Sequence, residues 1–464
     1  MIGAMFKLGE QKVRPGVFVR WYNAGGYTRY SRPLGVGAAV IKSNWGPVGA
    51  LFTVESGDMV KEMVGTGYGA DVVKEIFEGG AHFVQTVRIG TGGKPATLSL
   101  VAETLKSVEL RTLYPTSRLF SVTVREALDP ANKELIVFEG GRQIESITFA
   151  AGENEALSLV AAVLAKSKIL TASTDSTEST TVTAVINQPL TGGSDPETVA
   201  EDYTDGFKLT ETKFYDSVTV DSEDPSIHAA LHAFVRRKIR EGYRMTTFVG
   251  EKPTVDFEVR KSHAKAFNDF AVAYIGNGVQ TAAGVLTGAK AAGRVLGMFI
   301  SGSYKSSLTG KTITGGIGIE GELTASQYNE AATSGMMVFS LNSDGVPQID
   351  YGINTLVSLG EDEDEGWKKL RRVRTRYELI DRITVKIHKA MANDKDNNND
   401  DRQFICTLAN GEILQMTIEG GLESGKMIVD PTTTPEGDSA WFTFDNLVDL
   451  DGLEKAYLAF GFQY

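Results

Sequence analysis

The sequence has few of the residues from which most catalytic and metal sites are built. It contains one cysteine, Cys406, and five histidines among 464 residues. A disulfide within the chain and a zinc site of four thiolates are therefore excluded, and the protein fits assembly in a reducing cytoplasm. No apolar run approaches the roughly 20 residues that span a bilayer. The first residues lack a basic start followed by an apolar core, so we expect neither a secretion signal nor membrane insertion.

An excess of positive charge is also missing. The formal net charge is −12 at pH 7, and because binding of phosphates needs surplus Lys and Arg, we expect no nucleic-acid partner. What is present is an ordinary globular composition, 42% apolar and 23% charged, together with 50 glycines. At roughly 100–200 residues per domain, the length predicts about three domains.

The motifs of common enzymes are incomplete. His228 and His232 are four residues apart on a predicted helix, a spacing that can hold zinc, but HAALH lacks the glutamate of a metalloprotease and no third ligand is evident. The glycine-rich GTGYGAD misses the dinucleotide spacing, and TGKT at 309–312 has Lys305 where a phosphate loop needs glycine. No serine occupies a G-x-S-x-G elbow. Cys406 lies in the apolar run FICTL, which predicts a strand with a buried cysteine. We expect no catalytic, metal or cofactor site.

Alternation of strand and helix patterns predicts a central α/β domain in two parts, residues 31–93 and 196–358. Between them, residues 94–195 show successive strands with turns and one helix, which predicts an inserted, mostly β domain. Residues 359–464 are predicted as a C-terminal α+β domain with a closing strand, and residues 1–30 as an N-terminal arm and connector.

Each end of the chain carries an apolar strand pattern. VRPGVFVRWYN, at 13–23, is rich in β-branched and aromatic residues, and EKAYLAFGFQY closes the chain with alternating apolar positions. Such a terminal strand pairs either inside its own domain or with the exposed sheet edge of another copy. The candidates for inter-subunit strands are Val17, Phe18, Val19, Arg20, Trp21, Tyr22, Tyr457, Leu458, Ala459, Phe460 and Phe462.

A basic helix is predicted directly after the acidic run EDEDE at 361–365. Residues 366–390 contain nine Lys or Arg and two acidic residues, with apolar residues at helical spacing on one face. The basic face is either solvated, paired with acidic runs of neighbouring copies, or docked on an acidic protein partner. Nucleic acid fits less well, because no aromatic residues interleave with the charges. The docking candidates are Lys368, Lys369, Arg371, Arg372, Arg374 and Arg376.

Several segments together resemble the contractile-tail sheath proteins of bacteriophages and phage-derived bacteriocins. In chain order and in family order they are SNWGPVGALFTVES, IFEGGAHFVQTVRI, VLTGAKAAGRVLGMFISGSYKSSLTGKTI, IDYGINTLVSL, RRVRTRYELIDRI and EKAYLAFGFQY. The I-N-T-L signature is the most specific of them. The β block at 94–190 resembles the β-sandwich that many tailed-phage sheaths insert.

The resemblance implies a multidomain α/β and α+β fold with a central sheath domain, a β-sandwich-like insertion and extended terminal strand arms. It implies a structural subunit and not an enzyme. The subunit would polymerise helically around an inner tail tube and contract to drive the tube through a target cell envelope. The implied partners are further copies, the tube protein, and baseplate and tail-terminator proteins. The implied location is the host cytoplasm, then the virion tail or a released particle. An α/β hydrolase or nucleotide-binding enzyme, or a tube or baseplate protein, is the alternative.

Overall fold

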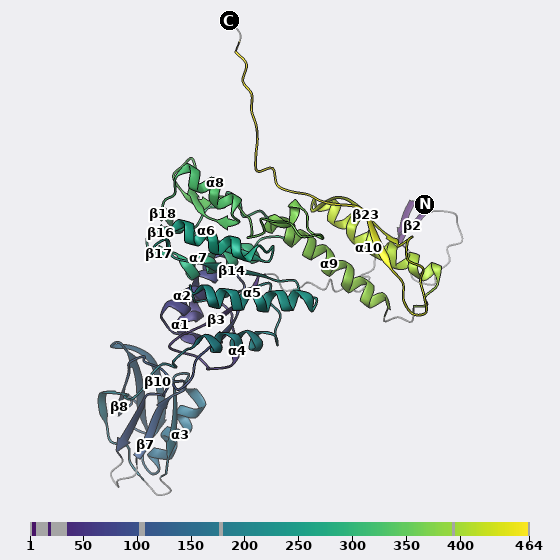
Figure 1. Ribbon diagram of the computed structural model, residues 1–464. Coiled ribbons are helices and arrows are strands. Elements are labelled where there is room, and N and C mark those ends of the chain that lie inside the picture. The colour runs from purple at the N-terminus through teal and green to yellow at the C-terminus, as the bar shows by residue number, and fades with distance from the viewer. Residues whose placement is uncertain are drawn as a thin grey trace. The chain divides into compact units, whose positions relative to one another are not determined.

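The computed structural model describes residues 2–5, 17–19, 35–101, 107–175, 180–391 and 395–462 (Figure 1). The chain divides into two compact units, Met1–Leu34 and Gly35–Tyr464. In the first unit, strand β1 (Ile2–Met5) pairs in parallel with β2 (Val17–Val19). The predicted N-terminal strand therefore has a partner in its own chain, while its residues Arg20, Trp21 and Tyr22 lie outside the described residues.

The centre of the second unit is a seven-stranded sheet in the order β19-β15-β14-β13-β3-β5-β4. Neighbouring strands run parallel except β4, which is antiparallel to β5. The strands are β3 (Val36–Ile41), β4 (Leu51–Val54), β5 (Phe83–Arg88), β13 (Ser217–Val220), β14 (Thr246–Gly250), β15 (Val272–Ile275) and β19 (Met336–Met337). All six residues of β3 are buried, as expected where helices cover both faces of a parallel sheet.

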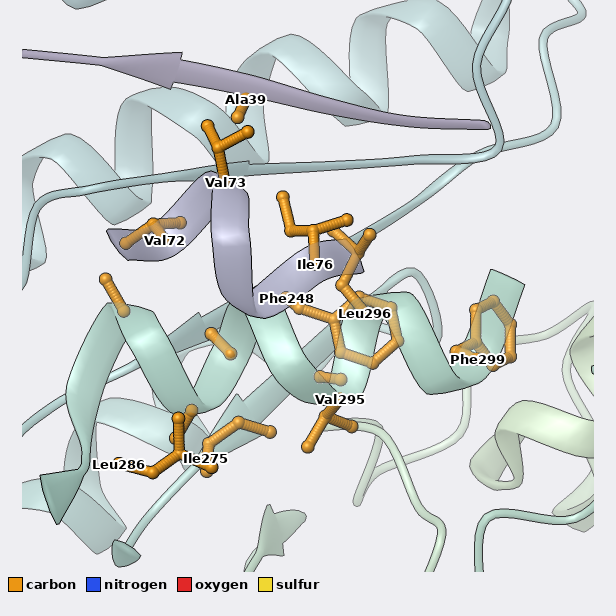
Figure 2. Packing of buried hydrophobic residues seen from close by; sticks show 14 of the residues in the cluster. Ala39, Val72, Val73, Ile76, Phe248, Ile275, Leu286, Val295, Leu296 and Phe299 are labelled. Atoms are coloured by element: carbon orange, nitrogen blue, oxygen red, sulfur yellow. The ribbon is translucent and has the colours of Figure 1, made fainter. Parts of the chain in front are cut away.

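Alternate residues of β3 belong to two different cores, one on each face of the sheet. Ala39 and Ile41 pack in the core that contains α2 (Tyr68–Glu78) and α7 (Gly288–Ser301), part of which Figure 2 shows. The opposite core is formed with α4 (Ala200–Thr210), α5 (Pro225–Arg240) and α6 (Phe257–Phe267). The predicted α/β layering is therefore confirmed. Helix α5 is capped at its N-terminus by the Asp224 side chain, which accepts a hydrogen bond from the Ser226 amide at 2.8 Å.

Helices α2 and α7 approach each other closely because glycine lies at their contact. A Cβ at Gly297 would lie 2.1 Å from the carbonyl oxygen of Ile76. We therefore expect Gly297→Ala to push the two backbones apart and to lower the free energy of unfolding by about 1–3 kcal/mol, measured by urea denaturation. The matched control is Gly411→Ala in another helix, where an added Cβ meets nothing within 4 Å and alanine favours the helix. Equal effects of the two substitutions would contradict this account.

Smaller elements complete the central part of the chain. They are η1 (Gly57–Met59), α1 (Val60–Met63), β16 (Gly278–Thr281), β17 (Gly284–Leu286), β18 (Gly316–Glu320), α8 (Ala325–Thr333), β20 (Phe339–Leu341) and β21 (Pro347–Ile349). Strands β17, β16 and β18 form one antiparallel sheet, and β20 pairs with β21.

The inserted block consists of two antiparallel sheets, β10-β9-β8-β12 and β11-β7-β6, with helix α3 (Glu155–Lys166). Its strands are β6 (Thr97–Val101), β7 (Ser107–Thr112), β8 (Phe120–Glu126), β9 (Asn132–Glu139), β10 (Arg142–Ala150), β11 (Leu170–Thr174) and β12 (Val185–Pro189). Inward residues of both sheets, such as Leu110 and Val122, share one hydrophobic core with α3. The predicted β-sandwich-like insertion is confirmed, whereas the residue boundaries of the domains stay predictions.

The C-terminal part contains η2 (Glu365–Lys368), two long helices, α9 (Leu370–Met391) and α10 (Asn399–Ile418), and a hairpin of β22 (Leu422–Val429) and β23 (Phe442–Asp449). The predicted strand around Cys406 is wrong, because Cys406 lies inside α10. The short apolar run did not distinguish strand from helix, but Ile405, Ala409 and Ile413 are buried at helical spacing. Cys406 itself is buried, as expected.

Candidate assembly surfaces and the carboxyl edge of the sheet

The carboxyl edge of a parallel sheet is where α/β proteins usually bind ligands, so the polar residues there test the enzyme alternative. Asp221, directly after β13, accepts hydrogen bonds from the Tyr203 hydroxyl at 2.6 Å and the Lys42 amide at 2.8 Å. Glu251, directly after β14, bonds Nδ1 of His263 at 2.8 Å. Burial raises the pKa of Asp221, and the hydrogen bonds from these donors offset part of that rise. The carboxylates at this edge are therefore bound by groups of the chain itself.

The N-terminus of α7, at the same edge, is occupied by a side chain of this protein. A Cβ at Gly288 would lie 2.2 Å from Oε1 of Glu223, so this carboxylate lies against the first turn of α7. The hydroxyl of Tyr68 also donates to Glu223. Helix N-termini attract anions through their free amides and dipole. The amides of Ala289 and Lys290 bond the Tyr68 hydroxyl, so Tyr68 and Glu223 together occupy the N-terminus of α7.

The two histidines of α5 do not converge on one point. His228 is buried and its Nε2 lies 2.8 Å from the carbonyl oxygen of Ser222, whereas Nε2 of His232 lies 2.7 Å from Oδ2 of Asp269. Burial also lowers the pKa of His228. Among the described residues, no group of three His, Cys, Asp or Glu side chains is arranged to hold a metal ion.

The basic residues at the start of α9 have acceptors within the subunit. Arg372 and Arg376 bind Asp449 at 2.7 and 3.0 Å, and Lys369 binds Asp451 and Glu454 at 2.6 and 2.7 Å. These acids lie on and just after β23. They form the spacing D-x-D-x-x-E immediately before the closing strand, a signal that the sequence analysis missed.

The other three docking candidates also make contacts within the subunit or have buried atoms there. Lys368 binds Glu365 at 2.9 Å. Arg374 donates to the last carbonyls of α7, those of Phe299 and Ile300. Nε of Arg371 is buried without a hydrogen-bond partner among the described residues. Docking of this helix on an inner tube or on a neighbouring copy stays a prediction, because the structure contains one subunit.

The closing strand has no strand partner among the described residues. The chain continues from Asp449 as an extended segment (Figure 1), and its apolar side chains are largely exposed. Exposed fractions reach 90% for Tyr457 and 93% for Phe462; Leu458, Ala459 and Phe460 are exposed as well. In addition, β22 and β23 form a sheet of only two strands, so both of its outer edges lack a partner within the described chain.

Comparison with known proteins identifies the central part of the chain. Residues 197–355 match the family model of the phage tail sheath protein central domain. By structure, the chain is similar to a sheath tail protein from Desulfitobacterium hafniense, with a TM-score of 0.70 and 18% identity, covering 90% of this chain and 97% of that chain. It is also similar to the helical sheath of the anti-feeding prophage in its contracted state, with a TM-score of 0.52 and 11% identity, covering 97% and 99% of the two chains.

A sequence relative extends over nearly the whole protein. The chain is 22% identical to the phage-like element PBSX protein XkdK of Bacillus subtilis (strain 168), covering 98% of this chain and 99% of the relative. The central-domain match and the shared fold confirm the resemblance to phage tail sheath proteins that the motifs indicated. The chain is thus similar to phage tail sheath proteins in its central region and in its fold. Within the part of the chain that the structure describes, no helix has the length and apolar character needed to cross a membrane.

Proposed function

We propose that this protein is the repeating subunit of a contractile tail sheath. Copies polymerise helically around an inner tail tube, and contraction of the sheath drives the tube through the envelope of a target cell. The proposal rests on the sheath central domain at 197–355 and on the fold shared with other sheath proteins. Baseplate and tail-terminator proteins would bind the two ends of the sheath. Assembly would take place in the host cytoplasm, and the product would be a virion tail or a released particle.

The observation that carries the proposal is the exposed apolar arm at 457–462, present together with a two-stranded sheet whose edges are unpaired. An apolar arm left in water is unfavourable, and addition of a strand to the sheet of a second copy buries it and satisfies backbone groups on both partners. Such a contact is heterologous, and its repetition generates rings or open helices. The N-terminal strand around Val17, Phe18 and Val19 would supply a second link between copies.

Electron microscopy of the purified protein tests this function. We expect hollow tubes to form as the protein concentration rises, since each added subunit buries one arm on its neighbour. Tubes of uniform diameter in negative stain would support the proposal. Monodisperse monomers at high concentration, under conditions in which the protein is folded by circular dichroism, would overturn it.

A further inference from the structure

Three carboxylates lie where the chain leaves β23 and becomes the exposed arm. They are Asp449, Asp451 and Glu454, and we call residues 449–454 the arm root. Each of them binds a basic side chain in the first turns of α9 or, for Lys369, directly before it. The arm root is therefore fixed to α9 and the residue before it, which lie outside the hairpin of β22 and β23.

The contact made by Asp449 is bidentate. Nε and Nη2 of Arg372 donate to its two carboxylate oxygens, both at 2.7 Å, and Arg376 adds bonds of 3.0 and 3.3 Å. The Asp449 side chain is only 9% exposed. Burial by itself would raise its pKa, but the hydrogen bonds and charges of Arg372 and Arg376 lower it to about 2. Bidentate pairs of this kind are among the strongest and most directional hydrogen bonds in proteins.

Glu454 makes the last of the arm-root contacts along the chain. Its carboxylate, 10% exposed, accepts from Nζ of Lys369 at 2.7 Å and from the Ser307 hydroxyl at 2.8 Å. Leu453 and Tyr457, on either side of Glu454, are 92% and 90% exposed, so the contacts of the carboxylate and not burial of the segment fix the chain here. The fixed segment therefore ends at or just after Glu454.

Helix α9 is in turn fixed to the central domain. Leu370, in its first turn, is fully buried in the core formed by α2 and α7. One turn later, Arg374 donates to the carbonyl oxygens of Phe299 and Ile300 at the C-terminal end of α7, where a cation also complements the helix dipole. A continuous set of contacts thus connects the arm root, α9, α7 and the core of the seven-stranded sheet.

We propose that the arm root is a mechanical anchor, in which Lys369, Arg372 and Arg376 transfer tension on the C-terminal arm to α9 and the central domain. Without this anchor, a pull on the arm would act on the last residue of β23 and open the hairpin one hydrogen bond at a time. With it, several ion pairs resist the pull together. The role under tension rests on the proposed sheath function, whereas the anchoring is a property of the single subunit.

Proteolysis of the soluble, full-length subunit tests the anchoring. A glutamate-specific protease cleaves after Glu454 only when the arm root detaches, while chymotrypsin cleaves the arm at exposed sites such as Leu458 and Phe460 in any case. In the double variant Arg372→Gln, Arg376→Gln we expect cleavage after Glu454 to become at least tenfold faster. The rate of chymotryptic cleavage in the arm should not change. In Arg372→Lys, Arg376→Lys, which keeps the charges but loses the bidentate geometry, the rate should be intermediate.

The matched control is Lys386→Gln, which also removes a charge from α9. Lys386 binds Glu412 and not the arm root, so this variant should leave both cleavage rates unchanged. If the double variant does not fold, Lys369→Gln serves in its place with the same expected direction. Equal rates of cleavage after Glu454 in the wild type and in folded variants would overturn the anchor. If the wild-type protein forms no tubes, the sheath function fails, but this comparison of cleavage rates still decides whether the arm root is anchored.

Discussion

Deletion of residues 457–464 is expected to abolish tube formation while the subunit stays folded and soluble. The described side chains of this segment are exposed, from 77% for Leu458 to 93% for Phe462, so the deletion removes little buried surface. Changes at such sites typically alter the free energy of unfolding by no more than about 0.5 kcal/mol, and the melting transition should hardly move. In the proposed assembly, tubes need the strand that the arm adds to the next copy, so we expect electron microscopy to show none. Loss of folded protein on deletion would place the arm in the subunit's own core.

A variant of unchanged length tests whether assembly needs the apolar side chains of the arm and not only its backbone. Leu458, Phe460 and Phe462 alternate along the chain and lie on one side of an extended strand. Their joint replacement by serine removes the apolar face and leaves the backbone able to pair. We expect tube formation to fail here as well, because backbone bonds alone do not compensate the ordering of the arm. Normal tubes from this variant would show that the apolar side chains of the arm are not needed for assembly.

Replacement of Arg88 by methionine is expected to destabilise the subunit by about 3–5 kcal/mol, the usual cost of removing one partner from a buried charged network. Arg88, at the end of β5, is fully buried. It donates to the carbonyl oxygens of Ser43 and Gly46 at 2.8 Å and of Pro115 at 2.9 Å. Burial lowers its pKa to about 10, so the guanidinium stays charged at neutral pH.

The Arg88 contacts join the central sheet to the inserted β block. Pro115 lies between β7 and β8 of the insertion, and Asp195, 3.7 Å from the guanidinium, lies where the chain returns from it. Besides a lower melting temperature, we therefore expect faster proteolysis at the two crossings between these parts in Arg88→Met. The control is Arg111→Met in β7, where the arginine side chain is about half exposed and binds Glu109, two residues before it. The free energy of unfolding should change by less than about 0.5 kcal/mol in this variant. Similar losses in both variants would contradict the central role of Arg88.

The sequence predicted those parts of the fold in which each element carries its own local signal. The Asp-Pro start of α5 and the apolar run of β3 are examples of signals carried by neighbouring residues alone. Cys406 shows the limit of such signals, because a short apolar run such as FICTL is compatible with both a strand and a helix. The helical spacing of the buried residues from Ile405 to Ile413 can be recognised only when the polar residues before them are identified as the helix start. There the Asn398 side chain accepts a hydrogen bond from the Asp401 amide.

The candidate assembly residues were less predictable, since their partners are distant in the sequence. The basic character of α9 was evident, but the pairing of Arg372 with Asp449 joins residues 77 positions apart, and no local pattern specifies it. The arms present the opposite case. Their apolar alternation was evident, yet any partner in another copy is absent from a single chain, so pairing between copies stays a prediction.

The carboxylate of Glu223 lies at the first turn of α7 as a part of the chain itself. A diffusing phosphate at such a position leaves when its concentration falls below the dissociation constant, and the stability that it contributes is lost with it. A carboxylate joined to the same backbone has an effective concentration that dilution does not change. What Glu223 contributes at this helix terminus therefore does not depend on the concentration of a diffusing ligand.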